Sequence, residues 1–211
     1  MADEALIVVF AKAPVPGEVK TRLIPTLGAE GAALLHAALT ERVLATAVAS
    51  GMDVLLCAAP DAGHAFFRAC AEDFDVPLAE QLAEADLGAR MLHALRQGLQ
   101  QYGRVIIVGA DCPALTAEHL RAAAGELTSH DVVITPADDG GYVLIGARRT
   151  TADMFHAIEW GSADVLARQR DALHRAGLDW HEMETLWDVD RPEDLPRLQA
   201  LKPALEFFWP A

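Results

Sequence analysis

The stretch Ala5-Leu-Ile-Val-Val-Phe-Ala-Lys-Ala-Pro-Val-Pro-Gly-Glu-Val-Lys-Thr-Arg-Leu23 decides the fold. Its first seven residues are all apolar, which predicts a strand that is buried on both faces, as in a parallel sheet. The two prolines and the glycine that follow predict a loop. This loop contains Lys12, Lys20 and Arg22, and Glu18 is the only acid among them.

Lysine is rare in this chain and is concentrated in this loop. The sequence has three lysines and fourteen arginines, and two of the three lysines lie here. The two residue types are not interchangeable, because an ammonium is a compact point charge and a guanidinium is a planar fork. The choice of lysine therefore indicates a local requirement, most simply a phosphate group. The alternative is a solvated connection that carries its lysines by chance.

The composition narrows the class of protein. A chain of 211 residues suggests a single domain, and 52% hydrophobic residues are enough for a sizeable core. No apolar run approaches the roughly 20 residues that span a bilayer, and the acidic N-terminus does not resemble a secretory signal. The three cysteines have no CxxC spacing. That pattern suits free thiols in a reducing cytoplasm and offers no zinc site.

The net charge of −14 argues against nucleic acid or an anionic membrane surface as the main partner. If such an acidic protein binds an anion, the positive charge must be local, and the opening loop supplies it. The same acidity would suit a divalent metal that arrives with the substrate.

Helical and strand patterns alternate along the chain with short loops, which predicts an α/β layered fold with a mostly parallel sheet. The predicted strands cover residues 5–11, 53–59, 76–81, 104–110, 131–136, 142–147 and 179–186. The predicted helices cover 28–50, a segment through Phe66, Phe67 and Cys70, then 86–101, 116–127, 160–175 and 191–201. Asp86 and Ser162 are expected to cap two of these helices.

The opening loop does not match two common phosphate-binding motifs. Gly17-Glu-Val-Lys20-Thr21 has the lysine and threonine of a Walker A loop but lacks the glycines at the required positions, and a GxGxxG fingerprint is absent. A strand, a turn and basic residues ahead of a helix still predict a phosphate cradle.

Asp111 follows the predicted central strand, at the end where ligands bind in open α/β sheets. A carboxylate there can hold Mg²⁺ or Mn²⁺ while phosphate oxygens complete the coordination. Alternatively, Asp111 caps the next helix or its turn. The neighbouring Cys112 could be a nucleophilic thiol with His119 as its base. The alternative is that Cys112 is a structural cysteine in a tight turn.

Two later acidic segments also follow predicted strands. Asp138-Asp139-Gly140-Gly141 would permit close approach of the backbone to a ligand, and Asp-Gly is equally a hairpin signal between two strands. In Trp187-Asp188-Val189-Asp190, the two aspartates share one face if the backbone is extended, so they could complete a metal site with Asp111. The alternative is helix capping by Asp190.

These segments together resemble a known family. The motifs are residues 10–17, 20–23, 109–113, 139–142, 160–165 and 187–190. They look like the bacterial radical-SAM/selenodomain-associated transferases of the glycosyltransferase-A superfamily of nucleotide-diphospho-sugar transferases. They occur in order from about residue 5 to residue 200. The resemblance implies one glycosyltransferase-A domain over residues 1–211, a three-layer α/β/α sandwich.

The resemblance also implies roles for individual residues. Lys20 and Asp111 would be catalytic. The nucleotide would contact Ala11, Lys12, Ala13, Pro14, Gly17, Lys20, Thr21, Arg22, Asp86 and Arg90. The metal would be held by Asp111, Asp188 and Asp190. The acceptor side would be lined by Asp139, Gly140, Gly141, Trp160 and Ser162. The superfamily's Asp-x-Asp motif is replaced by Asp111-Cys-Pro. This replacement favours nucleotidyl transfer to some extent.

The function implied is a Mg²⁺- or Mn²⁺-dependent cytoplasmic transferase that passes a group from a nucleotide-diphospho-sugar to a small-molecule acceptor. One alternative is a nucleotidyltransferase that releases pyrophosphate, and another is a nucleotide-binding protein without turnover. No nucleic acid or membrane span is expected. Residues 203–211 carry an aromatic tail, which we expect to pack on the domain or on a partner subunit in a homodimer.

Overall fold

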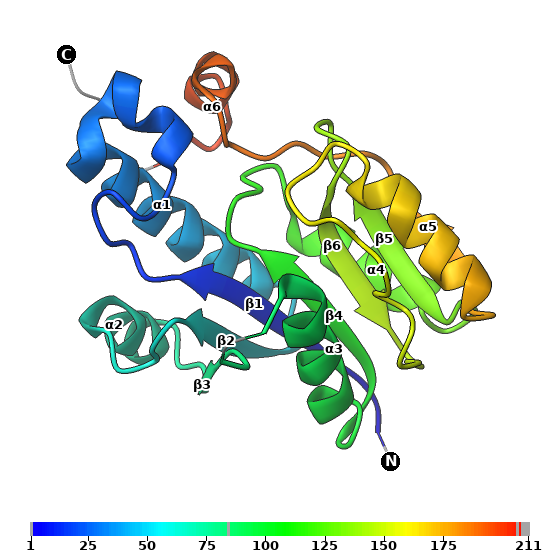
Figure 1. The fold of residues 1–211 in the computed structure, drawn as a ribbon. Coiled ribbons are helices and arrows are strands. Elements are labelled where there is room, and N and C mark those ends of the chain that lie inside the picture. The colour runs from blue at the N-terminus through cyan, green and yellow to red at the C-terminus, as the bar shows by residue number, and fades with distance from the viewer. Residues whose placement is uncertain (1, 84, 206, 208–211) are drawn as a thin grey trace.

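The computed structural model of the protein describes residues 2–83, 85–205 and 207. Within this part of the chain, one seven-stranded sheet has the order β3-β2-β1-β4-β6-β5-β7 (Figure 1). Its strands are β1 (Ala2–Lys12), β2 (Asp53–Ala59), β3 (Leu78–Glu80), β4 (Tyr102–Gly109), β5 (Val132–Pro136), β6 (Tyr142–Ala147) and β7 (Trp180–Glu182).

The sheet is mostly parallel, as predicted. Strand β1 pairs in parallel with β2 and β4, and the outer pairs β2–β3 and β5–β7 are also parallel. Strand β6 is the antiparallel member and lies between β4 and β5. The carboxyl ends of β1, β4, β5 and β7 therefore lie at the same edge of the sheet.

Helices cover both faces of the sheet, which gives the three layers (Figure 1). They are α1 (Ile24–Ala49), α2 (Ala65–Asp73), α3 (Leu87–Gly98), α4 (Ala117–Glu126), α5 (Val165–Arg175) and α6 (Leu195–Gln199). Helices α1, α2 and α4 share one hydrophobic core with the sheet, and α3 and α5 share the other. The three-layer α/β/α prediction is confirmed.

Strand β1 supplies side chains to both cores. Ile7 and Val9 are buried under α1 and α4, whereas Leu6 and Val8 are buried on the opposite face. Side chains alternate along a strand, so a continuous apolar run is required when both faces are covered. Full burial of each aliphatic side chain contributes about 1.5–3 kcal/mol, which makes this strand the centre of the fold.

A third hydrophobic cluster joins the two ends of the chain. Leu35 and Leu39 of α1 pack with Trp187, Val189 and neighbours from the C-terminal segment. Leu205 is buried in this cluster and Phe207 packs against it. Residues 206 and 208–211, the rest of the expected aromatic tail, lie outside the described residues. The cluster brings the segment of Asp188 and Asp190 toward the opening loop.

One helical stretch has the length and composition of a membrane span. It covers Thr21–Ala49 and has a mean hydropathy of 1.3 over its most apolar window. Half of that window is buried inside the protein, which is also a property of a core helix.

The structure corrects some predicted helix boundaries. Helix α5 begins at Val165 and not at Trp160, and its N-cap residue is Asp164. Ser162 is therefore not the cap that we predicted. Its hydroxyl donates a hydrogen bond to the Glu159 carbonyl, at 2.9 Å, within a turn that precedes the helix. Helix α1 starts before the predicted residue 28 and contains a kink at Gly28, where φ is 72°.

Candidate functional site

Three segments meet at the edge where β1 and β4 end. They are the loop of residues 13–20, the turn that holds Asp111, and residues 187–190 of the C-terminal segment. The Val189 amide donates a hydrogen bond to the Asp111 carbonyl, at 3.0 Å. Because β1 and β4 are parallel neighbours, their following loops start side by side. This is the edge at which ligands bind in open α/β sheets.

Lys20 ties these segments together. Its residue is only 9% exposed, and its Nζ lies 2.7 Å from Asp111 Oδ1. The same Nζ donates a hydrogen bond to the Val189 carbonyl, at 2.6 Å. The Lys20 backbone is left-handed, with φ of 47°, a conformation that costs a non-glycine residue about 1–3 kcal/mol. Lys20 is therefore not a solvated loop lysine, and that alternative is excluded for this residue.

Asp111 has one oxygen facing the interior and one facing the open side. Oδ1 is buried, whereas the side chain as a whole is 42% exposed. His36 Nδ1 lies 3.5 Å from Oδ1, and His36 Nε2 lies 2.9 Å from the Lys12 carbonyl oxygen. Burial by itself raises the pKa of Asp111, but the Lys20 charge and the contact with His36 outweigh it and hold that pKa well below its ordinary value. Asp111 is a fixed carboxylate.

Asp188 lies in an acidic environment beside it. Burial, followed by the negative charge of Asp139, raises the pKa of Asp188 to about 6. Lys20 opposes this increase and Asp111 adds to it. Three carboxylates thus lie close enough to repel one another, and a bound cation would relieve that repulsion.

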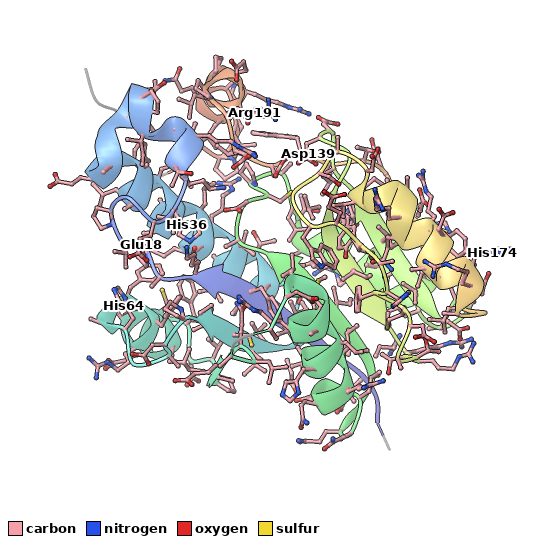
Figure 2. All side chains as sticks on the ribbon, in the orientation of Figure 1. Glu18, His36, His64, Asp139, His174 and Arg191 are labelled. Atoms are coloured by element: carbon pink, nitrogen blue, oxygen red, sulfur yellow. The ribbon has the colours of Figure 1, made fainter. Side chains whose placement is uncertain are left out.

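A hollow of about 200 Å³ opens beside Asp139 and Asp188, and neither Asp111 nor Lys20 is among its lining residues. Asp188 and Asp190 both line it; that they share one face and complete a metal site with Asp111 stays a prediction. The Asp190 carboxylate accepts a hydrogen bond from Arg22 Nη1, and this ion pair links the opening loop to the C-terminal segment. On the other wall, Arg197 Nη1 lies 2.8 Å from Asp138 Oδ2. Figure 2 shows Asp139 and Arg191, two further lining residues, on separate segments.

The glycines before β6 make a close approach possible. Gly140 has φ of 92°, and a Cβ there would lie 2.1 Å from the Ala163 carbonyl oxygen. The Gly140 carbonyl accepts a hydrogen bond from the Leu166 amide, at 2.9 Å. Asp139 Oδ1 accepts one from the Gly141 amide, at 2.8 Å. The segment is the predicted hairpin turn between β5 and β6, and it also places Asp139 beside Asp188.

The remaining residues of the opening loop surround Lys20. Lys12 is exposed, and its Nζ donates a hydrogen bond to the Glu18 carbonyl, at 3.0 Å. Gly17 has φ of 87° and is exposed, as are Thr21 and Arg22. The side chains of Ala11 and Ala13 are buried and that of Pro14 is half-buried. Lys12, Lys20 and Arg22 are thus gathered around one loop.

Asp86 and Arg90 make local contacts. Asp86 Oδ1 accepts a hydrogen bond from the Ala89 amide, at 2.8 Å, so Asp86 is the predicted cap of α3. Arg90 Nε donates one to the Ala85 carbonyl, at 2.8 Å. Arg90 lines a hollow of about 700 Å³ beside α3, and neither Lys20 nor Asp111 lines it. The structure does not bring these two residues to Lys20 and Asp111. Their contact with a nucleotide stays a prediction.

Trp160 and Ser162 lie on the α5 side of the sheet. The Trp160 ring is half-buried and packs 6.2 Å from the Phe155 ring and 6.5 Å from the Tyr142 ring, centre to centre. Ser162 is half-buried as well. Ala163, in the same turn, contacts Gly140, so this turn borders the Asp139 hairpin.

The thiol-nucleophile hypothesis is wrong. Cys112 is 2% exposed, and burial raises the pKa of its thiol to about 12. The expected base, His119, has Nε2 at 2.8 Å from Thr135 Oγ1. A buried, protonated thiol does not act as a nucleophile, so Cys112 is structural.

His36 is a site residue that the sequence reasoning missed. It is 5% exposed and lies on α1, between the Asp111 carboxylate and the Lys12 carbonyl (Figure 2). A single histidine on the apolar face of a helix was the available signal. That signal is weak, since such a residue is more often a hydrogen-bonded core histidine.

Comparison of the sequence with family models gives one match. The model of DUF2064, described as "Uncharacterized protein conserved in bacteria", matches residues 42–162. This chain belongs to the DUF2064 family. A search of curated protein sequences finds no match.

Solved structures are similar to this DUF2064 protein over nearly its whole length. A candidate nucleotide-diphospho-sugar transferase from Desulfovibrio desulfuricans G20 is 32% identical, with a TM-score of 0.83. The match covers 96% of this chain and 90% of that one. The match therefore extends well beyond residues 42–162, the region that the family model matches.

More distant structures share the fold alone. A nucleotidyl transferase from Methanothermobacter thermautotroptrophicus is 15% identical, with a TM-score of 0.65, and the match covers 94% of this chain and 97% of that one. A 4-diphosphocytidyl-2C-methyl-D-erythritol synthase from Anaerococcus prevotii DSM 20548 is 13% identical, with a TM-score of 0.62. That match covers 94% of this chain and 98% of the other. The DUF2064 protein therefore has the fold of nucleotide-sugar and nucleotidyl transferases.

Proposed function

We propose that this DUF2064 protein is a cytoplasmic transferase that binds an activated nucleotide at the Lys20 edge of the sheet. The observation that carries the proposal is the clamp formed by Lys20, Asp111 and the Val189 carbonyl. It places a buried ammonium and an ionised carboxylate side by side at the ligand-binding edge. The likeness to the D. desulfuricans protein supports the same assignment, as does the resemblance of the sequence motifs to radical-SAM/selenodomain-associated transferases.

The donor phosphates would lie over the opening loop. Lys20 is held rigidly, whereas Lys12 and Arg22 are exposed and carry contacts that a phosphate could replace. Fixed positive charges stabilise the negative charge that develops on a phosphate leaving group. Backbone amides in a turn before a helix add further donors. Rate enhancement would then be electrostatic, with no covalent intermediate on the protein.

A divalent metal fits the carboxylates on the open side of the clamp. The superfamily implies Mg²⁺ or Mn²⁺, and the donors here are carboxylate oxygens, which these hard cations prefer. Asp111 and Asp188 would hold the metal; the pKa of Asp188 is raised by burial first and then by the negative charges of Asp139 and Asp111. Asp190, which pairs with Arg22, completes the expected set. When bound, the metal would neutralise charge on the donor pyrophosphate.

The proposed reaction is transfer of a sugar from a nucleotide-diphospho-sugar to a small-molecule acceptor. The bond between the anomeric carbon and the diphosphate breaks, and the nucleoside diphosphate leaves. The acceptor would approach from the hairpin of Asp139, Gly140 and Gly141, with the turn of Trp160 and Ser162 behind it. The contact of Gly140 with Ala163 joins these two segments.

The second candidate is nucleotidyl transfer. A phosphorylated acceptor would attack the α-phosphate of a nucleoside triphosphate, and pyrophosphate would leave. The replacement of Asp-x-Asp by Asp111-Cys-Pro and the folds of the distant neighbours favour this form. A third candidate is a nucleotide-binding protein without turnover.

A product assay separates the three. The protein is incubated with Mg²⁺, a mixture of labelled acceptors, and either nucleotide sugars or nucleoside triphosphates. Sugar transfer with release of nucleoside diphosphate supports the leading form. Pyrophosphate release without sugar transfer supports the nucleotidyl form and rules against the glycosyl form. Nucleotide binding with neither product supports the binder.

The expected homodimer belongs to the same proposal. Leu205 and Phe207 pack on the cluster of α1 and Trp187, so the tail starts on the domain itself. Deleting residues 207–211 and measuring the mass in solution tests whether the tail seals a dimer. An unchanged mass would remove the tail from any subunit interface.

A further inference from the structure

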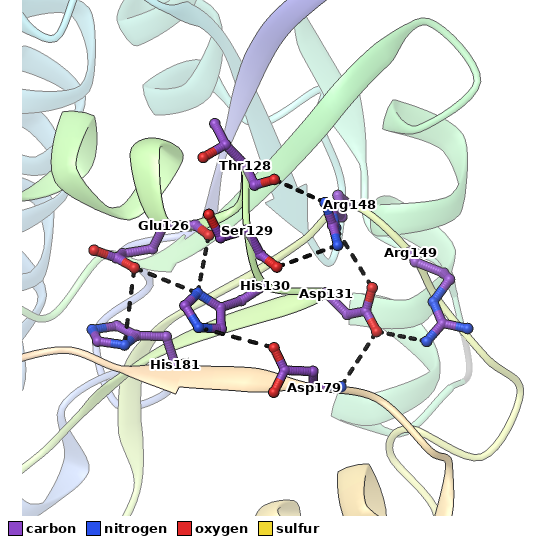
Figure 3. Close-up of polar contacts among 9 residues, drawn as sticks. All are labelled: Glu126, Thr128, Ser129, His130, Asp131, Arg148, Arg149, Asp179 and His181. Carbon is purple, nitrogen blue, oxygen red and sulfur yellow. Dashed lines mark hydrogen bonds and ion pairs between the residues drawn. The ribbon is translucent and has the colours of Figure 1, made fainter.

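At the opposite edge of the sheet, where β5 begins, two imidazoles surround a carboxylate (Figure 3). Glu126 is the last residue of α4, His130 precedes β5, and His181 lies within β7. We propose that Glu126, His130 and His181 form a metal site for a borderline divalent cation, Zn²⁺ above all. This proposal is independent of the reaction at the Lys20 edge.

The three ligand groups are already gathered. One ligand atom of each residue lies within 4.8 Å of the other two. Glu126 Oε2 lies 3.4 Å from His130 Nδ1 and 3.9 Å from His181 Nδ1. Around a tetrahedral zinc with bonds of ~2.1 Å, ligand atoms are about 3.4 Å apart. The cluster therefore needs only a small closure to bind the ion.

The spacing suits ligands of a shared ion better than hydrogen-bond partners. Good hydrogen bonds between nitrogen and oxygen are about 2.7–3.2 Å long, and both distances from Glu126 Oε2 exceed that range. His130 Nδ1 has a nearer contact, the Glu126 carbonyl oxygen at 3.2 Å. A carbonyl oxygen only accepts, so this contact needs an N–H that an ion bound at Nδ1 would replace. The two rings lie 5.3 Å apart, centre to centre, with the carboxylate oxygen near both.

Neighbouring contacts hold the ligands in place. The Arg148 guanidinium donates hydrogen bonds to the carbonyls of Thr128 and Ser129, at 2.9 and 3.4 Å, which fixes the turn before His130 (Figure 3). Asp131 Oδ2 accepts from Arg149 Nη2 at 2.5 Å and from the Asp179 amide at 3.3 Å. These bonds anchor both the His130 turn and the start of β7, so the site is organised before any ion arrives.

The chemistry of the donors selects the metal. Two imidazole nitrogens and one carboxylate oxygen are a ligand set for zinc, whereas Mg²⁺ prefers oxygen alone. The side chains of His130, Glu126 and His181 are 29%, 39% and 41% exposed, so solvent can reach the fourth tetrahedral position. Asp179 Oδ2 lies 3.9 Å from His130 Nε2, which is beyond hydrogen-bond distance, so this carboxylate adds negative charge beside the ring without fixing it.

An ion here would fasten the edge strand to a helix. Strand β7 pairs with β5 alone at the end of the sheet, and α4 lies with α1 and α2 in the helical layer on one face of the sheet. The chain runs from β7 to Asp188 and from Asp111 to α4. A metal that joins α4 to β7 would therefore stabilise the two elements that lead to the carboxylates of the other site.

Zinc titration of the full-length protein tests this site. The titrations contain excess Mg²⁺, which occupies the all-oxygen site at the other edge. We expect the wild-type protein to bind one equivalent of Zn²⁺ with a rise in unfolding temperature, and His181→Gln to bind it at least about tenfold more weakly. His174→Gln, an exposed histidine of α5, is the matched control and should bind like the wild type.

Two results would overturn the proposal. One is the absence of zinc binding by the wild-type protein, and the other is equal binding by wild type and His181→Gln. Circular dichroism checks that the variants fold. Glu126→Gln, which changes a partly exposed carboxylate, provides a second variant if His181→Gln does not fold, and it should lose zinc binding in the same way.

Discussion

At one edge of the sheet the carboxylates of Asp111 and Asp188 lie around a buried lysine, and at the other edge Glu126 lies between two imidazoles. The first site offers oxygen donors and a fixed ammonium, which suit phosphate and a hard cation. The second offers nitrogen and oxygen donors near the surface, which suit zinc. The ligand atoms, and not the number of acids, distinguish the two sites.

Substitution of Lys20 should reduce turnover more than any other change, and the second site has no counterpart of this lysine. Lys20→Met removes the ammonium that faces Asp111 Oδ1 and the donor phosphates, so we expect turnover to fall about 10²–10³-fold. Zinc binding at Glu126, His130 and His181 should not change. Lys202→Met, at the remaining lysine, which is exposed, is the matched control. Equal turnover in both variants would remove Lys20 from the mechanism.

Gly140→Ala tests the hairpin on the acceptor side. A methyl group would meet the Ala163 carbonyl oxygen at 2.1 Å, and φ is 92°, so we expect a loss of about 2 kcal/mol or more in the free energy of unfolding. Gly125→Ala, in α4, meets no atom within 4 Å and should stabilise the protein by about 0.5–1 kcal/mol. Urea unfolding measures both. An unchanged free energy of unfolding in Gly140→Ala would show that the hairpin can move to accommodate the methyl group.

Asp131 tests how firmly the histidine site is held. Its hydrogen bond from Arg149 lowers the pKa of the carboxyl in the folded state, against a smaller opposing effect of burial. Its contribution to stability is therefore present above the pKa of the unfolded chain and is lost as the pH falls through the folded-state pKa. Asp131→Asn should cost about 1–3 kcal/mol at neutral pH and less in acid.

Urea unfolding of wild type and Asp131→Asn at neutral and acidic pH measures this difference. Asp171→Asn, an exposed aspartate of α5, is the control. A gap between wild type and Asp131→Asn that stays constant with pH would contradict the assigned cause of the pKa shift. We also expect zinc to bind Asp131→Asn more weakly, because the His130 turn loses an anchor.

Much of the fold followed from local sequence patterns. Strands β2 and β6 have their predicted bounds, and Asp86 caps α3 as expected. These features depend on alternation, turn residues and capping, all of which act within a few residues. The start of α5 was misplaced because Trp160 lies in a turn and packs on Phe155 and, eighteen residues away in the sequence, on Tyr142, a contact that no local pattern reports.

The site divides in the same way. That Lys20 and Asp111 lie near the same edge of the sheet could be predicted, because each comes after a parallel strand in the chain and ligands bind at that edge in open α/β sheets. His36 could not, because its role depends on contacts with residues from two other segments. His130 and His181 are distant in the sequence, and only the pairing of β5 with β7 brings them together. The separation of these two histidines in the sequence matches no common metal-binding motif.

Nucleotide-dependent thermal stability, measured with and without Mg²⁺, tests whether a nucleotide and a metal bind at the Lys20 edge. Nucleotide at about 100 times its dissociation constant should add roughly 2.7 kcal/mol to wild-type stability. Asp171→Asn should respond equally. Asp111→Asn should lose the Mg²⁺-dependent part of this gain while it keeps its stabilisation by Zn²⁺. A full Mg²⁺-dependent gain in Asp111→Asn would contradict the assignment of the nucleotide–metal site to the Lys20 edge.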